Sequence, residues 1–393
     1  MRLDAMRRRA LVNGAIAGAV TLVVGSLIVA GVSSGDLDIP RASPSSSPTP
    51  TPPPCEPSWE IVRSANPDDV SHTLNAVVAL AASEAWAVGG SGDPASPLDV
   101  LIERWDGTAW TPEEAPSPGS QTNELLAVDA AGPNDVWAVG RTASGFGERP
   151  LALHYDGTEW LEVALPEDAT GVLTGVAAIS PSDVWAVGFS GDPDASLERA
   201  LILHWDGLLW AVVDGGRAVG SGTSALRDVD ATAPDDVWAV GYLHNRPLIV
   251  RWGGQAWARS ETEVNGVAND VEPLTPAEGW VVGAPIQRFD GVAWSLDTPV
   301  REEGELLSAA TVGPTDVWAV GLRPVEVGET RSIVMRFDGQ RWTPVEGRGA
   351  AGSDALTGID ALPDGTVLGV GFKDVEDGRR VLAIRGTTCF PAV

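Results

Sequence analysis

Short apolar segments alternate with turn residues along most of the chain, from about residue 55 to residue 390. In one stretch the apolar runs are 125–130, 136–140 and 151–155, and an Asp-Gly pair then leads to a fourth run that opens with Trp160. Asp-Gly is a strong hairpin signal because glycine accepts the positive φ that the turn requires. The pattern predicts four short strands that form one antiparallel sheet.

The second strand of this pattern recurs seven times, as Trp-Ala-Val-Gly or a close variant. The tryptophan stands at Trp86, Trp137, Trp185, Trp238, Trp280 and Trp318, and Leu368 takes its place in the last copy. Successive copies are 38 to 53 residues apart. A repeat of about 40–50 residues built from short strands is typical of propeller blades. We therefore predict an all-β fold over residues 55–393, a seven-bladed β-propeller with four-stranded antiparallel blades.

The fourth strand of a repeat opens with a tryptophan, but only six such tryptophans lie inside the seven repeats. The last repeat lacks one, whereas Trp59 precedes the first repeat and fits the empty position. We predict that this N-terminal strand completes the last blade and closes the ring, which removes open sheet edges. The same alignment brings Cys55 and Cys389 to one turn and predicts a disulfide, which a location outside the cytoplasm permits.

Residues 10–32 are apolar and uncharged, and Arg7, Arg8 and Arg9 precede them. At about 1.5 Å per residue the stretch reaches roughly 35 Å, enough to cross the hydrocarbon core of a bilayer. We interpret it as a transmembrane anchor, with a cleaved signal peptide as the alternative. The basic residues place the segment 1–9 in the cytoplasm and the propeller outside. This predicts a single-pass protein of the cell membrane, or a secreted protein if the segment is cleaved.

Residues 33–54 are rich in Pro, Ser and Thr. A segment of this composition cannot bury a core, and it favours an extended, disordered chain. We interpret it as a stalk that holds the propeller away from the membrane.

The formal net charge of the chain is −28. A surface this acidic repels nucleic acid, so we predict no nucleic-acid partner. Six repeats place an acid two residues before the second-strand tryptophan and a base just before the third-strand aromatic residue. We expect these acids and bases to pair in a ring that ties the blades together, and the tryptophans to pack between blades.

The aromatic-Ala-Val-Gly strand, the variable loop, the aromatic-Asp-Gly turn and the final tryptophan together resemble the kelch repeat. The resemblance covers about residues 55–390 and implies a propeller like the central domain of the galactose-oxidase superfamily. The chain departs from the kelch pattern because only Gly89-Gly90 forms a double glycine, and Trp or Phe often replaces the tyrosine. The copper site of that superfamily needs Tyr, His and a Tyr-linked Cys. With two Tyr, four His and two Cys already assigned to the disulfide, the chain is not expected to have a copper site.

No Ser/His/Asp set, paired catalytic carboxylates or sialidase-type Asp box stands out, so we predict no catalytic residue. Two classes of function remain. In the first, which we favour, the propeller is a membrane-tethered extracytoplasmic binding or scaffold module for a protein or glycan partner, because repeat scaffolds present extended binding surfaces. In the second, it is a secreted carbohydrate-active enzyme, a glycosidase or a lyase.

A ligand is expected on the face that carries the loops between second and third strands and between blades. These loops vary most in length, and loops on a rigid scaffold are where binding usually resides. The candidate binding residues on this face are Phe146, Arg149, Tyr242, His244 and Arg246. Asp93, Asp192 and Asp194 are weaker candidates for holding a cation such as Ca²⁺, and no other cofactor is expected.

Overall fold

The computed structural model describes residues 58–64, 70–92, 97–144, 147–192, 197–262, 264–297, 304–326, 328–345, 352–376 and 378–387. The segments 1–9, 10–32 and 33–54 lie outside these ranges, as do Cys55 and Cys389, so the anchor, the stalk and the disulfide stay predictions. Within the described ranges, no helix combines the length and the apolar character needed to span a membrane.

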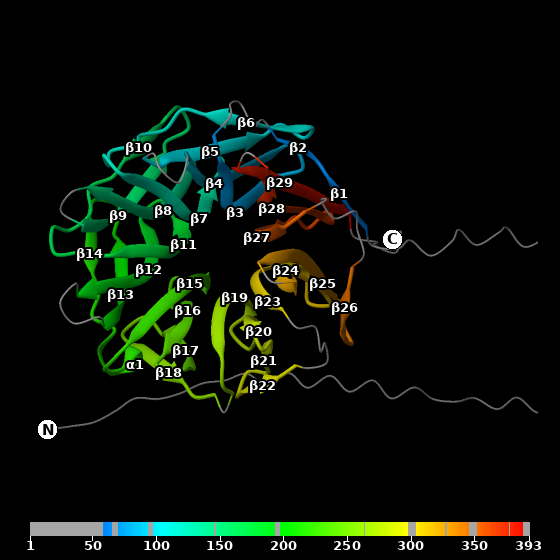
Figure 1. Cartoon of the computed structure of the whole chain (residues 1–393). Coiled ribbons are helices and arrows are strands. Elements are labelled where there is room, and N and C mark those ends of the chain that lie inside the picture. The colour runs from blue at the N-terminus through cyan, green and yellow to red at the C-terminus, as the bar shows by residue number, and fades with distance from the viewer. Residues whose placement is uncertain are drawn as a thin grey trace, which may run out of the picture. The chain divides into compact units, whose positions relative to one another are not determined.

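Seven antiparallel sheets surround a central axis as the blades of a propeller, which confirms the predicted fold (Figure 1). The strands of blades 1 to 4, each blade from its inner to its outer strand, are β3 (His72–Ala81), β4 (Glu84–Ser91), β5 (Asp99–Trp105) and β6 (Ala109–Glu113); β7 (Thr122–Gly132), β8 (Asp135–Ser144), β9 (Gly147–Tyr155) and β10 (Trp160–Glu162); β11 (Val172–Ser180), β12 (Asp183–Asp192), β13 (Leu197–Trp205) and β14 (Trp210–Val212); β15 (Ser224–Ala233), β16 (Asp236–Leu243), β17 (Arg246–Trp252) and β18 (Trp257–Ser260).

Blades 5 to 7 continue in the same order, and the N-terminal strand is the outermost strand of blade 7. Their strands are β19 (Val267–Thr275), β20 (Glu278–Ala284), β21 (Gln287–Phe289) and β22 (Trp294–Leu296); β23 (Glu305–Gly313), β24 (Asp316–Glu326), β25 (Glu329–Phe337) and β26 (Trp342–Pro344); β27 (Asp354–Ala361), β28 (Thr366–Val375), β29 (Gly378–Thr387) and β1 (Ser58–Ile61). A single turn of helix, α1 (Gly216–Val219), lies between blades 3 and 4.

The glycine that follows the valine in every second strand is required by a bulge in the first strand. Each first strand carries a bulge, for example at Leu126 between Leu125 and Ala127 in blade 2. The bulge pushes the first-strand carbonyl of Glu124 so close that a Cβ on Gly140 would lie 2.0 Å from its oxygen. The corresponding distance is 1.9 to 2.1 Å in all seven blades. No side chain fits there, which explains why the glycine recurs even in the degenerate last repeat.

The second-strand tryptophans pack between blades, as expected. Trp86 of blade 1 lies against Tyr155 and Trp160 of blade 2, with ring centroids 4.8 and 5.3 Å apart. Its ring is 1% exposed. The same arrangement recurs from blade to blade, so most of the apolar core lies in the layers between neighbouring sheets.

The recurring acids and bases pair within a blade, so the expectation that they tie blades together is wrong. Arg104 contacts Glu84 at 3.0 Å, and both residues belong to blade 1. The register explains this, because Trp86 lies directly opposite Arg104 on the neighbouring strand and the acid stands two residues before the tryptophan. The Arg104 guanidinium also lies over the face of the Trp86 ring, 5.1 Å from its centroid.

The N-terminal strand closes the ring, which confirms the prediction. β1 pairs with β29, with Trp59 opposite Gly386. Trp59 shares a buried cluster with Trp318 of blade 6, so it occupies the position that a fourth-strand tryptophan holds in the other blades. The chain then continues into β2 (Arg63–Ser64), which pairs in parallel with β6 of blade 1 and gives that blade a fifth strand. This second attachment was not foreseen, and it joins the segment 58–64 to both the first and the last blade.

Candidate functional site

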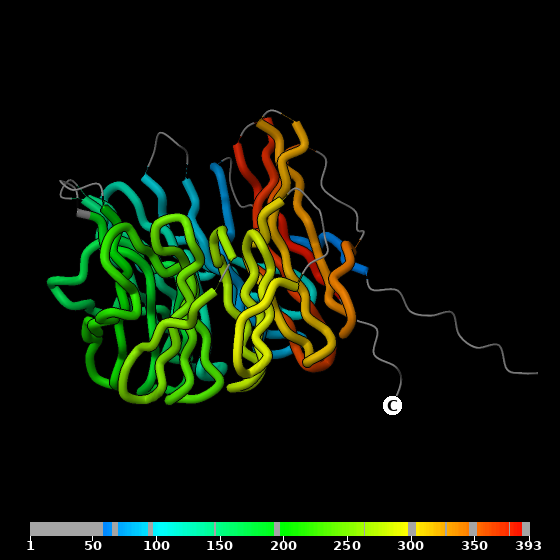
Figure 2. The backbone as a smooth tube through the Cα atoms, turned by 90° about the horizontal axis from the view of Figure 1, so that it is seen from below, coloured from blue at the N-terminus to red at the C-terminus, as the bar shows by residue number. Residues whose placement is uncertain are grey.

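The two faces of the propeller differ in relief, as Figure 2 shows. One face carries the tight turns between first and second strands and between third and fourth strands. The other, here called the loop face, carries the connections between second and third strands and between blades. The β24–β25 and β28–β29 hairpins project far on the loop face, whereas the β20–β21 connection is short because Ala284 and Gln287 end and begin the two strands.

A cavity of about 650 Å³ opens beside this low part of the loop face. Its walls come from the β16–β17 hairpin and from the segment that links blade 4 to blade 5, and we call it the blade 4 pocket. The lining residues are Thr223, Leu243, His244, Asn245, Arg246, Pro247, Leu248, Arg259, Ser260, Glu261, Thr262 and Asn265. Two of the predicted binding residues, His244 and Arg246, therefore line one pocket.

His244 is held in an uncommon backbone conformation. Leu243 pairs with Arg246, so His244 and Asn245 are the two turn residues of the hairpin. His244 has a φ of +58°, the one positive φ outside glycine in the described residues, at a position where two-residue hairpins usually carry Gly, Asn or Asp. Its ring packs over Gly222, where a Cβ would lie 2.7 Å from Nε2. The absence of a side chain at residue 222 therefore makes room for the imidazole.

Two arginines supply positive charge to the same pocket. Arg259 donates from Nε to the Ala218 carbonyl at 2.7 Å, which attaches its guanidinium to the turn of helix α1. A Cβ on Gly220 would lie 2.6 Å from Nη2 of Arg259, so a second glycine leaves space for a second pocket side chain. Arg246 is exposed, and no described residue forms a hydrogen bond or an ion pair with its side chain. The pocket contains one acid, Glu261.

Tyr242 lies near this hairpin but does not line the pocket. Its hydroxyl donates to Glu198 of blade 3, and Arg227 lies over its ring at 5.6 Å. Burial and the Glu198 carboxylate raise the pKa of Tyr242 to about 12, so the phenol stays protonated and acts as a donor. These contacts connect blades 3 and 4. Tyr242 therefore contributes to the packing between these two blades.

The remaining candidates are separated from the blade 4 pocket. Arg149 is exposed on the β8–β9 hairpin of blade 2 and does not line the blade 4 pocket. Phe146, Asp93 and Asp194 lie outside the described residues, and Asp192 ends β12 with a side chain that is also outside them. The described part of the chain contains no group of three or more His, Cys, Asp or Glu side chains placed to hold a metal ion.

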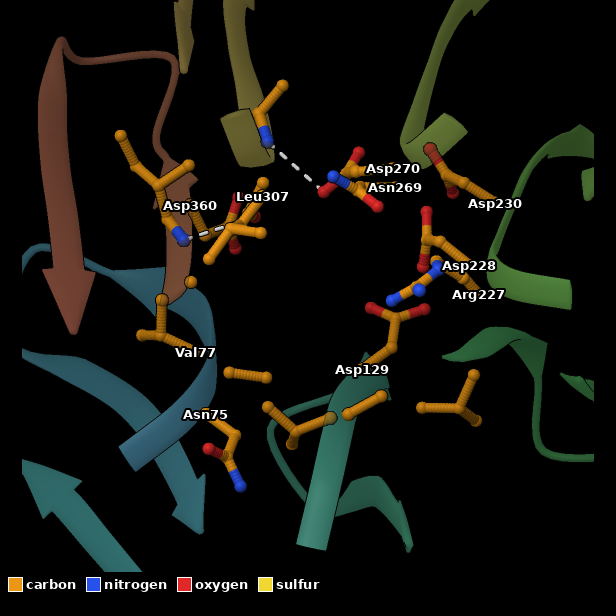
Figure 3. A pocket seen from close by; sticks show the side chains of 18 of the residues that line it. Asn75, Val77, Asp129, Arg227, Asp228, Asp230, Asn269, Asp270, Leu307 and Asp360 are labelled. Atoms are coloured by element: carbon orange, nitrogen blue, oxygen red, sulfur yellow. Dashed lines mark hydrogen bonds between the residues drawn. The ribbon is translucent and has the colours of Figure 1, made fainter. Parts of the chain in front are cut away.

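A second cavity, of about 320 Å³, lies on the propeller axis and is lined by the first strands of all seven blades (Figure 3). We call it the central cavity. Six acidic side chains line it. They are Asp129, Asp228, Asp230, Asp270, Glu272 and Asp360. Among the described residues that line the cavity, Arg227 is the only base.

Four of these acids bind the backbone of the next blade. Asp129 accepts a hydrogen bond from the Ala178 N–H at 2.7 Å, and Asp360 accepts one from the Ala79 N–H at 2.7 Å. Asp228 and Asp270 accept the N–H groups of Val271 and Ala309 at 3.0 and 3.1 Å. The innermost strand of a blade is a free sheet edge, and its N–H groups need partners. The acids supply these partners and so connect adjacent blades around the axis.

Asp230 stands at the same register position as Asp129 and Asp360 but meets a different partner. The residue of blade 5 that corresponds to Ala178 and Ala79 is Pro273, which has no N–H to donate. One oxygen of Asp230 accepts the N–H of Ala231 at 2.7 Å. Asp230 therefore lacks a backbone partner across the blade boundary.

Burial raises the pKa of the central carboxyls. The pKa is about 7 for Asp360 and about 6 for Asp228, and those of Asp230, Asp270 and Glu272 lie well above their usual range. Desolvation is the main cause, and repulsion between neighbouring carboxylates adds to it. The sequence did carry a signal for this cluster, because acids alternate with apolar residues along the first strands of blades 4 and 5. That signal was missed because the same acid-apolar alternation also describes a strand with one solvated face.

No protein-family model matches the chain, and no curated protein matches it. Solved structures do match. One is described as YCF48 bound to D1 peptide, with a TM-score of 0.54 and 17% identity over 87% of this chain and 100% of that one. Another is the extracellular domain of the hybrid two component system BT4673 from B. thetaiotaomicron, with a TM-score of 0.54 and 11% identity over 86% of this chain and 40% of that one. At these identities the likeness shows the fold, a seven-bladed propeller, and the kelch-type resemblance remains an expectation.

Proposed function

We propose that this chain is a binding module whose loop face engages a protein partner outside the cytoplasm, with residues 10–32 as its membrane anchor. The observation that carries the proposal is the blade 4 pocket. Arg246 and His244 line a concave site on the loop face, and no described residue forms a hydrogen bond or an ion pair with the Arg246 guanidinium. Concave sites with a few convergent polar groups are where ligands usually bind.

The comparisons support this proposal in two ways. One similar propeller was solved with a bound peptide, and another is an extracellular domain. Both features suit a propeller that presents its loop face to other proteins outside the cell. The predicted orientation of the chain, with the propeller beyond the membrane, agrees with them.

Capture of the partner from native membranes tests the proposal. The full chain, immobilised through its N-terminus, is incubated with a surface extract, and captured proteins are identified by mass spectrometry. A variant with both His244→Ala and Arg246→Ala should lose the partner that the wild type retains. Arg341→Ala, an exposed arginine on the turn face, is the matched control and should retain it. A partner that is lost only when the turn face is altered would overturn the choice of the loop face.

The central cavity supports a second candidate function, a carbohydrate-active enzyme. Carboxyls with raised pKa values beside ionised neighbours are the groups that general acid–base hydrolysis uses. Release of reducing ends from plant and bacterial polysaccharides, by the wild type but not by Asp230→Asn, would favour this function. Equal or absent release by the two proteins would leave the binding module as the function of the propeller.

A further inference from the structure

We infer that the blade 4 pocket binds a carboxylate group carried by a peptide segment of the partner protein. This inference rests on the proposed function and names the chemistry that the partner presents. It comes from the charge of the pocket, from the way its side chains are held and from the residue types that are missing from its walls.

The charge of the pocket is opposite to that of the molecule. The chain carries a net charge of −28, yet the pocket gathers two arginines, Arg246 and Arg259, against one acid, Glu261, with the His244 ring beside them. Several other basic residues are already paired with acids, for example Arg336 with Asp316 and Arg141 with Glu124. A concave site with uncompensated positive charge attracts anions, and an acidic surround repels anions elsewhere on the surface. The pocket is therefore the place where an anionic group is stabilised.

The side chains of Arg259 and His244 are supported by the backbone behind them. The Ala218 carbonyl accepts from Nε of Arg259 at 2.7 Å and the Arg217 carbonyl accepts from Nη2 at 3.4 Å, which leaves the N–H groups of Nη1 and one of Nη2 for a ligand. Gly220 and Gly222, with φ values of +80° and +106°, bring the backbone directly beneath Arg259 and His244. Such support lowers the entropy cost of binding, because part of the site is already ordered. A planar guanidinium of this kind matches a carboxylate with two parallel hydrogen bonds.

The walls favour a peptide over an acidic sugar. Leu243, Pro247 and Leu248 form the apolar part of the lining. The chain contains 16 tryptophans, and none of the residues that line the pocket is Trp, Tyr or Phe. The C–H faces of a sugar ring pack best on a flat aromatic ring, whereas an aliphatic wall suits an apolar side chain next to the acid. At about 650 Å³ the pocket has room for an acidic residue and its neighbour.

The experiment begins with a random dodecapeptide phage library, panned on the full chain and counter-selected on Arg246→Ala. The selected peptides are synthesised, and their affinities are measured by calorimetry. We expect Asp, Glu or a free C-terminus in every binder, next to an apolar residue. Loss of one charge-assisted hydrogen-bonded contact should weaken binding about ten- to a hundredfold, both for Arg246→Ala and for the peptide in which an amide replaces the carboxylate. Arg246→Lys should recover part of the affinity, and the turn-face control Arg341→Ala should bind like the wild type.

Binders that lack a carboxylate, or equal affinity for the wild type and a folded Arg246→Ala variant, would overturn the inference. Trigalacturonate is the probe for the other source of a carboxylate. If it bound more tightly than the peptides, and lost affinity in Arg246→Ala, the peptide assignment would be wrong. Failure of the proposed function is a separate result. A partner captured on the loop face that ignores Arg246→Ala contradicts the pocket alone, whereas a partner captured on the turn face contradicts the proposed function.

Discussion

Glu103 is a buried carboxyl at a position where most other blades carry an apolar side chain. Its counterparts opposite the second strand include Leu153, Leu203 and Val250. The Glu103 carboxylate accepts hydrogen bonds from the Ser64 hydroxyl at 2.8 and 3.0 Å, so it holds the strand β2 against blade 1. Burial raises the pKa of Glu103 to about 7, although the Ser64 contact lowers it.

Glu103→Gln should remove the cost of this buried charge. A carboxyl whose folded pKa exceeds its unfolded value stabilises the protein at low pH and loses that contribution as the pH rises through about 7. The variant should therefore match the wild type near pH 4 and exceed its unfolding free energy by about 1–3 kcal/mol near pH 8.5. Chemical denaturation at the two pH values checks this. A variant that is less stable than the wild type at pH 8.5 would show that the ionised carboxylate contributes more than its burial costs.

At the scale of the element, the second strand is constrained by the bulge in the first. Gly140 has no room for a Cβ because the Glu124 carbonyl oxygen would lie 2.0 Å from it. The bulge also turns the inner strand so that its side chains reach the next blade. Glycine at this position therefore permits the close approach of the first and second strands in each blade.

Gly140→Ala should destabilise the propeller by about 3 kcal/mol or more, because the backbone of two packed strands must move apart. Gly132→Ala is the matched control, since a Cβ there meets nothing within 4 Å, and it should change the free energy of unfolding by less than about 0.5 kcal/mol. Equal effects of the two substitutions in urea unfolding would refute the steric explanation.

At the scale of the whole molecule, the segment 58–64 contacts both ends of the ring. Trp59 is 9% exposed and packs with Trp318. Trp59→Ala should cost about 3–5 kcal/mol, because the cavity lies in the last layer between blades. Leu208→Ala, at a side chain 84% exposed, should change stability by less than about 0.5 kcal/mol. An unchanged denaturant midpoint for Trp59→Ala would mean that the ring stays closed without this strand.

The central cavity should give the propeller an unusual dependence on pH. Its carboxyls have raised pKa values, so the folded chain binds more protons than the unfolded chain between pH 4 and the folded values of about 6 and 7. The melting temperature should consequently rise as the pH falls from 8 to 5. Asp230→Asn removes one of these charges without removing a backbone partner across the blade boundary, so its rise should be smaller. A wild-type melting temperature that falls over this range would contradict the assignment.

The Cys55–Cys389 disulfide also belongs to this scale, because it would join the two ends of the propeller. It should be found as one linked pair of peptides in a non-reducing digest of the protein exported to an oxidising compartment. Two free thiols there would exclude it.

The repeat pattern was enough to predict the number of blades, their strands and the closure by Trp59. Hydrophobic period, turn residues and motif counts are local properties, and a fold made of repeated local units is readable from them. Two features could not be predicted from local pattern. They are the pairing of acids with bases inside each blade and the attachment of β2 to blade 1. They depend on which strands become neighbours and in what register.

Less of the candidate site than of the fold could be predicted from the sequence. His244 and Arg246 were predicted from their place in a loop, and the structure adds Arg259 of the neighbouring strand β18 to the same pocket. The convergence of Asp228, Asp270 and Asp360 could be recognised only from the structure, because the seven first strands meet at one axis only after the ring has closed. Local pattern determined the blades. The convergence of carboxyls from different blades at the axis, and with it their raised pKa values, was decided by the tertiary structure alone, because the first strands meet there only in the closed ring.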